Sequence, residues 1–165
     1  MSTFVSVGNA TQPFSRLLDE VVRMAEVLPQ PIVVQHGATP FQAVSCQAVP
    51  FVDMIEFERM VAGAELLILH AGAGSVIHAV CAGKVPVVMP RRVAFGEHVD
   101  DHQIEFAQAL AAAGQVVVAD EAIQLRDAVQ KALALQRESG KASSDTSLML
   151  KLIDETLADY ARRFP

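Results

Sequence analysis

The 165-residue sequence predicts a single α/β domain built on a doubly wound parallel sheet. Short apolar runs typical of buried strands alternate with amphipathic helical patterns, which favours parallel pairing with right-handed crossovers. Hydrophobic residues make up 52% of the chain and the mean hydropathy is +0.31, as expected for a sheet covered on both faces or for a domain with a partner surface. The length is sufficient for one hydrophobic core.

The first half of the chain begins with a strand predicted at residues 3–7, where apolar and polar residues alternate. Pro13 suits the first turn of a helix, and apolar residues then recur every three or four positions, so residues 13–28 are predicted to be helical. Pro29 and Pro31 end this helix. The next predicted elements are a strand at 32–35, a weaker strand at 44–49, a helix at 53–62 and a strand at 66–70.

The second half continues the alternation of helices and strands. Its predicted elements are a helix at 74–82, a strand at 85–89, a helix at 100–113, a strand at 115–119, a helix at 122–138, a polar loop at 139–147 and a last helix at 148–164. Ligands of such folds bind beyond the carboxyl ends of the strands. We therefore expect a ligand near the loops at 8–12, 37–40, 70–75 and 90–102.

Composition excludes several classes of function. The net charge of −6 predicts no nucleic-acid partner, although the pair Arg91-Arg92 is locally basic. Cys46 and Cys81 form no CxxC pair and stand in apolar surroundings, which predicts buried, reduced thiols in a cytoplasmic protein. The sequence shows no secretory signal, and its most apolar window, residues 61–88, is too interrupted to supply the roughly 20 apolar residues of a membrane span.

A glycine loop at residues 71–75, with the sequence AGAGS, follows the apolar strand that ends at His70. Free amides at the start of the next helix, the positive end of the helix dipole and the Ser75 hydroxyl together suit a diphosphate. The alternative is a tight turn in which Ser75 only caps the helix.

The segment GEHVDDHQ places many hydrogen-bonding side chains just before a predicted helix. Polar contact with a sugar and its phosphates is one use, and a solvated first turn capped by Asp100 is another. A metal site is a third, because His98 and His102 are four residues apart with Asp101 and Glu105 nearby. Since His98 precedes the helix and no third ligand has a known zinc spacing, we expect sugar contacts, no metal and no cofactor.

Four segments, FVSVGN, HAGAGS, GKVPVVMPRR and GEHVDDHQIEFAQAL, resemble the donor-binding C-terminal domain of glycosyltransferase family 28, over residues 3–119. The likeness extends to the small catalytic subunit of the two-chain N-acetylglucosaminyltransferase that acts on dolichol diphosphate sugars, and to bacterial exopolysaccharide relatives. It implies that residues 1–165 form one Rossmann-like domain, the C-terminal half of a GT-B glycosyltransferase. Such enzymes are typically inverting and metal-independent, and use a UDP-sugar donor.

The resemblance also implies roles for single positions. Residues 72–75 match the loop that meets the donor diphosphate, and His102 and Gln103 match the pair that contacts the diphosphate and the sugar hydroxyls. Phe51 and Val52 lie where the family makes backbone contacts to uracil. The residues expected to bind the UDP-sugar are Gly8, Asn9, Phe51, Val52, His70, Gly72, Ala73, Gly74, Ser75, His78, Glu97, His98, His102 and Gln103.

Two departures from the family pattern affect this expectation. His78 stands where the family usually has a glutamate that holds the ribose hydroxyls, and a neutral imidazole cannot chelate two hydroxyls as a carboxylate does. The chain also carries only one of the two domains that such enzymes need. No residue shows triad or paired-carboxylate spacing, so no general base is assigned to this chain.

The resemblance therefore implies the donor-binding catalytic subunit of a two-component hexosyltransferase, which moves a sugar from a UDP-sugar to a polyprenyl-linked acceptor in polysaccharide biosynthesis. A membrane-associated subunit would supply the acceptor site and hold the protein at the inner face of the membrane. The apolar stripe of residues 148–164 would cover the sheet or pack on that partner, and the isolated chain is expected to form homo-oligomers. A nucleotide-sugar epimerase of the same fold and a non-enzymatic nucleotide-binding regulatory module are the alternatives.

Overall fold

The computed structural model describes residues 2–139 and residue 158. The predicted last helix at 148–164 and the predicted loop at 139–147 therefore lie outside the described residues, apart from Ala158 and from Ser139, which ends a helix.

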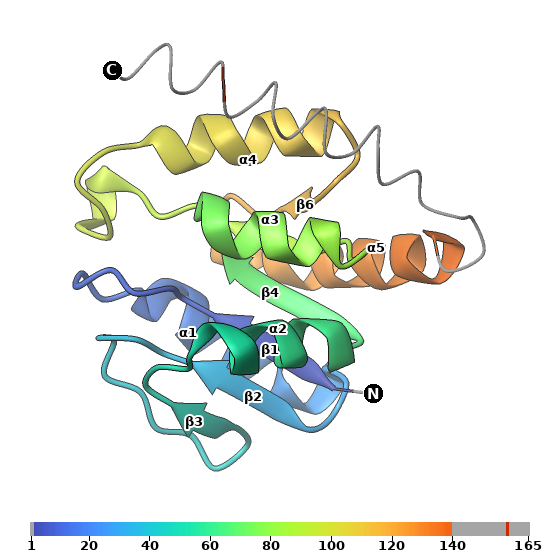
Figure 1. The fold of residues 1–165 in the computed structure, drawn as a ribbon. Helices are drawn as coiled ribbons and strands as arrows, with labels where there is room; N and C mark the ends of the chain where they lie inside the picture. Colours follow the sequence, from blue (N-terminus) through green and yellow to red (C-terminus); the bar gives the residue numbers. More distant parts are fainter. Residues whose placement is uncertain (1, 140–157, 159–165) are drawn as a thin grey trace.

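Six parallel strands form one sheet in the order β3-β2-β1-β4-β5-β6 (Figure 1). The order runs outward in both directions from β1 and β4, which is the doubly wound, Rossmann-like arrangement that the sequence predicts. Val5 in the centre of β1 lies beside Val34 of β2 and Ile68 of β4. The strands are β1 Thr3–Ser6, β2 Ile32–Gln35, β3 Gln47–Val49, β4 Leu66–His70, β5 Val87–Met89 and β6 Val117–Val118.

Helices cover both faces of the sheet, and Figure 1 shows α2 and α3 in front of it and α1 and α5 behind it. Because successive residues of a strand point to opposite faces, Val5 joins the core under α1 and α5, and Phe4 joins the core under α2, α3 and α4. The helices are α1 Ser15–Arg23, α2 Met54–Gly63, α3 Ala73–Cys81, α4 His102–Ala112 and α5 Leu125–Ser139, with short 3-10 turns at Ala25–Val27, Val93–Phe95 and Ala122–Gln124.

The predicted element boundaries hold best for buried strands and least well for helix ends. The predicted helix at 13–28 begins later, at Ser15, because Phe14 has non-helical dihedrals (φ −125°, ψ 52°), and its amide donates to the Thr39 hydroxyl at 3.0 Å. The predicted helix at 100–113 begins at His102, because the Asp101 carboxylate accepts from the Val93 amide (2.9 Å) and holds the preceding loop in a bend.

Both cysteines are free, but the prediction that they are buried is wrong. Cys81 is exposed because α3 turns Val76, Ala79 and Val80 toward the sheet and leaves its last residue outside that face. Cys46 is half-buried. Within the described residues, no helix has both the length and the apolar character needed to cross a membrane.

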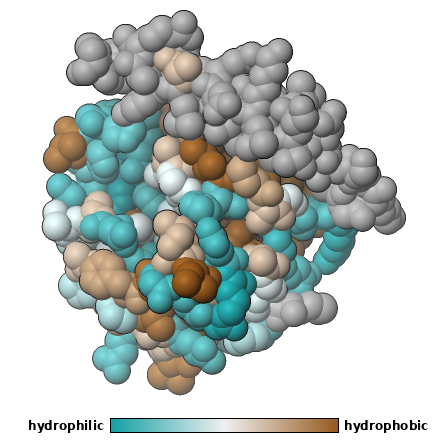
Figure 2. All heavy atoms as spheres, in the orientation of Figure 1, coloured by the Kyte–Doolittle hydropathy of each residue, from teal (hydrophilic) through white to brown (hydrophobic). Residues whose placement is uncertain are grey.

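The face seen in Figure 2 is mixed, with apolar side chains in small separate groups among hydrophilic ones. The exposed large apolar side chains of the described residues are concentrated in two segments. One precedes and opens α2, and the other is the loop between β5 and α4. The first contains Val44, Phe51, Met54 and Ile55, and the second contains Val93, Phe95 and Val99.

Candidate functional site: a pocket at the carboxyl edge of the sheet

A cavity of about 250 Å³ opens at the carboxyl ends of β1 and β4, where the strand order reverses. This reversal point is the usual ligand site of open α/β sheets. Eight of the residues that the sequence predicts to bind a donor meet there, together with three that it does not predict. The eight are Gly8, Asn9, Val52, His70, Gly72, Ala73, Gly74 and Ser75, and the three are Ser6, Gln35 and Phe57.

The glycine loop leads directly into α3 at the pocket wall. Gly72 is the N-cap residue with extended dihedrals, and no side chain caps the helix. The first N–H groups of a helix have no partner within it, so those of α3 remain for a ligand. An anion in the cavity would gain these hydrogen bonds and the positive end of the helix dipole.

Gln35 holds two of the loops around the pocket. It lies at the end of β2, is buried, and its amide nitrogen donates to the Gly8 and Pro50 carbonyls, each at 3.2 Å. Its amide oxygen accepts from the Ser6 hydroxyl at 2.5 Å. A polar residue at a strand end, where an apolar one is expected, is the sequence signal that could have identified Gln35.

His70 lies between the two glycine loops that form the pocket. A Cβ atom built on either Gly8 or Gly72 would clash with its imidazole ring, so both positions require glycine. Burial, together with the nearby positive charge of Arg91, lowers the pKa of His70 to about 4. The ring is therefore neutral at pH 7, and its Nδ1 is buried without a hydrogen-bond partner.

Acidification should destabilise the protein through His70. Because folding lowers this pKa from 6.5 to about 4, the unfolded chain takes up the proton first as the pH falls. The free energy of unfolding does not depend on the protonation of His70 above pH 6.5. Between pH 6.5 and pH 4 it falls by up to about 3 kcal/mol, because only the unfolded chain is protonated at this residue. Urea denaturation of the wild type and of His70→Asn across this range should show a steeper pH dependence for the wild type, whereas parallel curves would contradict this assignment.

Gly74 differs from the other glycines of the pocket. It is the second residue of α3, it does not have a positive φ, and a Cβ built on it would meet no atom within 4 Å. The backbone therefore does not require glycine here. Because Gly74 has no side chain, the pocket wall is open at this position.

Arg91 holds the loops beneath the pocket together. It is 0% exposed, and its guanidinium donates to the Val7 and Gln12 carbonyls, each at 2.8 Å, and to the Glu97 carbonyl at 3.0 Å. The guanidinium carbon also lies 4.7 Å from the centre of the Phe14 ring. Burial lowers the pKa of Arg91 to about 10, against the opposing effect of Glu97, so the side chain stays charged at pH 7.

Glu97 and Gln103, both predicted to contact the donor, use their side-chain oxygens within the protein. Glu97 is buried and forms two hydrogen bonds with Arg16, at 2.9 and 2.8 Å, and it also accepts from the Arg92 amide at 3.1 Å. Gln103 is buried, and its Oε1 accepts from the Arg91 amide at 3.1 Å. In this structure both residues shape the loop between β5 and α4, and their contact with a ligand stays a prediction.

The other predicted residues lie outside the pocket lining. Phe51 is 57% exposed next to Val52. His78 is half-buried on α3, where its Nδ1 lies 3.5 Å from a carboxylate oxygen of Glu58 and its ring meets Phe57 edge-on. Their roles toward a donor also stay predictions.

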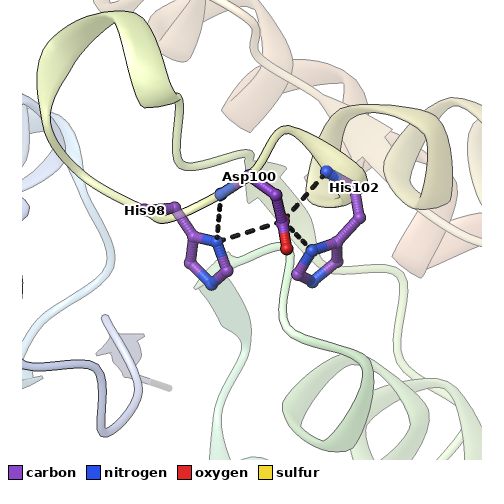
Figure 3. Close-up of side chains that lie close together, drawn as sticks. All are labelled: His98, Asp100 and His102. Carbon is purple, nitrogen blue, oxygen red and sulfur yellow. Dashed lines mark hydrogen bonds and ion pairs between the residues drawn. The ribbon is translucent and has the colours of Figure 1, made fainter. Parts of the chain in front are cut away.

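His98 and His102 stand on either side of Asp100 at the start of α4 (Figure 3). The Asp100 carboxylate lies 3.2 Å from Nδ1 of His98 and is hydrogen-bonded to Nδ1 of His102. The sequence suggests Asp101 and Glu105 as the acidic neighbours of the two histidines. Asp100 is the residue that the fold places between them.

Comparisons with known proteins agree with this architecture. The family model described as glycosyltransferase family 28 C-terminal domain matches residues 2–157. The structure is similar to the calicheamicin glycosyltransferase CalG4, with 20% identity, a TM-score of 0.62, and coverage of 99% of this chain and 44% of that one. It is also similar to MurG of Acinetobacter baumannii, with 19% identity, a TM-score of 0.55, and coverage of 93% and 49%.

The glycotransferase of kitacinnamycin is a further similar structure, with 19% identity, a TM-score of 0.59, and coverage of 93% of this chain and 42% of that one. The chain thus spans less than half the length of each of these three structures. At such identities the likeness establishes the fold. Comparison with curated proteins finds no match.

Proposed function

The chain belongs to the glycosyltransferase family 28 C-terminal domains, and on this basis we propose that its carboxyl-edge pocket binds the nucleotide part of a UDP-sugar donor. The observation that carries the proposal is the meeting of the Gly8 loop and the 72–75 loop at the uncapped start of α3. Backbone amides there suit a diphosphate, and Val52 at the pocket wall offers an apolar contact for the base.

The same amides give the pocket a role in the chemistry. When the sugar leaves the donor, negative charge develops on the departing diphosphate, and fixed N–H groups and the α3 dipole stabilise that charge without reorganisation. We propose inverting transfer of a hexose that needs no metal for donor binding. We assign the general base to no residue of this chain.

We further propose that a second, membrane-associated subunit supplies a polyprenyl-linked acceptor during polysaccharide assembly. The exposure of Val93, Phe95 and Val99 in the loop beside the sheet edge supports this proposal. Such apolar side chains suit contact with a partner. Efficient transfer to a lipid-linked acceptor by the purified chain alone would contradict the need for a partner.

Calorimetric titration with UDP in the presence of EDTA tests the donor proposal. We expect saturable binding of one UDP per chain, and at least tenfold weaker binding of UMP, because UMP lacks the second phosphate for the amides of α3. His102→Ala should weaken UDP binding in the folded protein. Binding that is seen only after magnesium or manganese is restored would contradict metal-free binding, and no binding under either condition would contradict the proposed function.

A further inference from the structure

We propose that His98, Asp100 and His102 form a binding site for a divalent transition metal of the zinc class. Within the described residues, each of the three offers one ligand atom, and these atoms all lie within 4.8 Å of one another. Figure 3 shows the two imidazole rings turned toward the carboxylate that stands between them. The three side chains would hold the ion without a bound nucleotide, and two of them, His98 and His102, are also predicted to contact the donor.

The hydrogen bonds of the cluster indicate a place for a cation. The Asp100 backbone amide donates to Nδ1 of His98 at 3.3 Å, so this nitrogen faces Asp100. The Asp100 carboxylate oxygen, itself an acceptor, lies 3.2 Å from the same nitrogen. A ring nitrogen and a carboxylate oxygen at this distance are joined either by a hydrogen on the nitrogen or by a metal ion between them.

The spacing of the ligand atoms fits a small ion. Zinc binds imidazole nitrogen and carboxylate oxygen at roughly 2.0–2.2 Å, so two ligands of one tetrahedral ion lie about 3.3 Å apart. The distance from Asp100 to His98 has this value within 0.1 Å, at 3.2 Å, whereas the His102 ring, which is hydrogen-bonded to Asp100, would have to rotate away from the carboxylate to make room for the ion. Two imidazoles and one carboxylate are a ligand set for zinc, cobalt or iron in proteins, with further positions open to water.

The surroundings favour a site that is both ordered and accessible. The His98 and His102 side chains are 17% and 25% exposed, which limits their freedom, whereas Asp100 is 53% exposed and leaves an open side for the ion and its water. The Asp101 carboxylate holds the preceding loop through the Val93 amide. A bound ion would join this loop to the first turn of α4.

Titration of the full-length chain with Zn²⁺ after dialysis against EDTA tests the proposal. We expect one Zn²⁺ per chain, bound at least tenfold more weakly by His98→Ala and by the isosteric Asp100→Asn. The same titration with Co²⁺ should give visible absorption bands of nitrogen and oxygen ligation in the wild type. Zn²⁺ should also raise the Tm of the wild type and not that of Asp100→Asn.

Two control variants separate this site from other metal-binding groups. His36→Ala removes an imidazole from a different loop and should leave Zn²⁺ binding unchanged. Cys46→Ser/Cys81→Ser removes both thiols and should also have no effect. Equal Zn²⁺ affinity of the wild type, His98→Ala and Asp100→Asn would overturn the proposal, as would loss of binding in the thiol variant. Because UDP is titrated in EDTA, failure of the metal site and failure of the donor pocket are distinguishable.

Discussion

Replacing Arg91 with methionine should destabilise the fold by about 3 kcal/mol or more, the largest loss of stability that we expect from a single exchange in this protein. The change removes the donors for three carbonyls, those of Val7, Gln12 and Glu97, and each buried acceptor left without a partner costs about 1–3 kcal/mol. The free energy of unfolding from urea denaturation measures the effect.

Arg23→Met is the matched control for this exchange. Arg23 lies on α1 with a side chain that is 70% exposed, and it pairs with Glu20 at 3.0 Å. Exposed ion pairs of this kind contribute about 0–1 kcal/mol, so the control should be nearly neutral. Equal small losses for both variants would mean that the buried guanidinium does not hold the loops of the pocket together.

Gly74→Val should reduce UDP affinity at least a hundredfold and leave the fold intact. A valine side chain would occupy the open space that Gly74 leaves at the pocket wall, where we place the donor diphosphate. Because Gly74 is helical with no positive φ, valine fits the backbone and the change in stability should stay within about 1 kcal/mol. Calorimetry with UDP and thermal unfolding measure the two quantities.

Gly63→Val is the control, because Gly63 is also a helical glycine on which an added Cβ would meet no atom within 4 Å, and it lies at the far end of α2, outside the pocket lining. It should bind UDP as the wild type does. Unchanged affinity in a folded Gly74→Val variant would exclude this wall from the donor site.

For the glycine loop, the sequence predicts a ligand-binding role but not the reason why each glycine is present. Its composition and its place after the strand at 66–70 predict a ligand loop, and the structure puts that loop at the strand-order reversal. The reason for each glycine could not be predicted from the sequence. Gly72 has to be glycine because the His70 ring lies against it, and Gly74 has an ordinary helical backbone.

Buried polar contacts over long sequence distances were beyond prediction. In the sequence, Arg91 stands out only as half of a basic pair. Its partners at Val7 and Gln12 are 84 and 79 residues away and contribute only backbone carbonyls, which no side-chain pattern reveals. The strands were easier to predict, because their apolar runs are local and the parallel order follows from the alternation of elements.

The cluster at the start of α4 depended on a local detail of the chain. A helix beginning at Asp100 would favour ligands spaced by three or four residues, such as Asp101 and Glu105. The helix begins at His102, and the bend before it places Asp100 between the two rings. A shift of two residues in a helix start therefore determined which carboxylate joins the histidines.

NMR of the uniformly ¹⁵N-labelled chain during titration with UDP in EDTA shows whether the carboxyl-edge pocket binds a nucleoside diphosphate. We predict that the largest amide shifts fall on residues 72–75 and on Gly8 and Asn9, with small shifts in the exposed part of α2 around Gly63. Shifts that gather away from the two glycine loops, or no shifts at millimolar UDP, would mean that this pocket does not bind a nucleoside diphosphate.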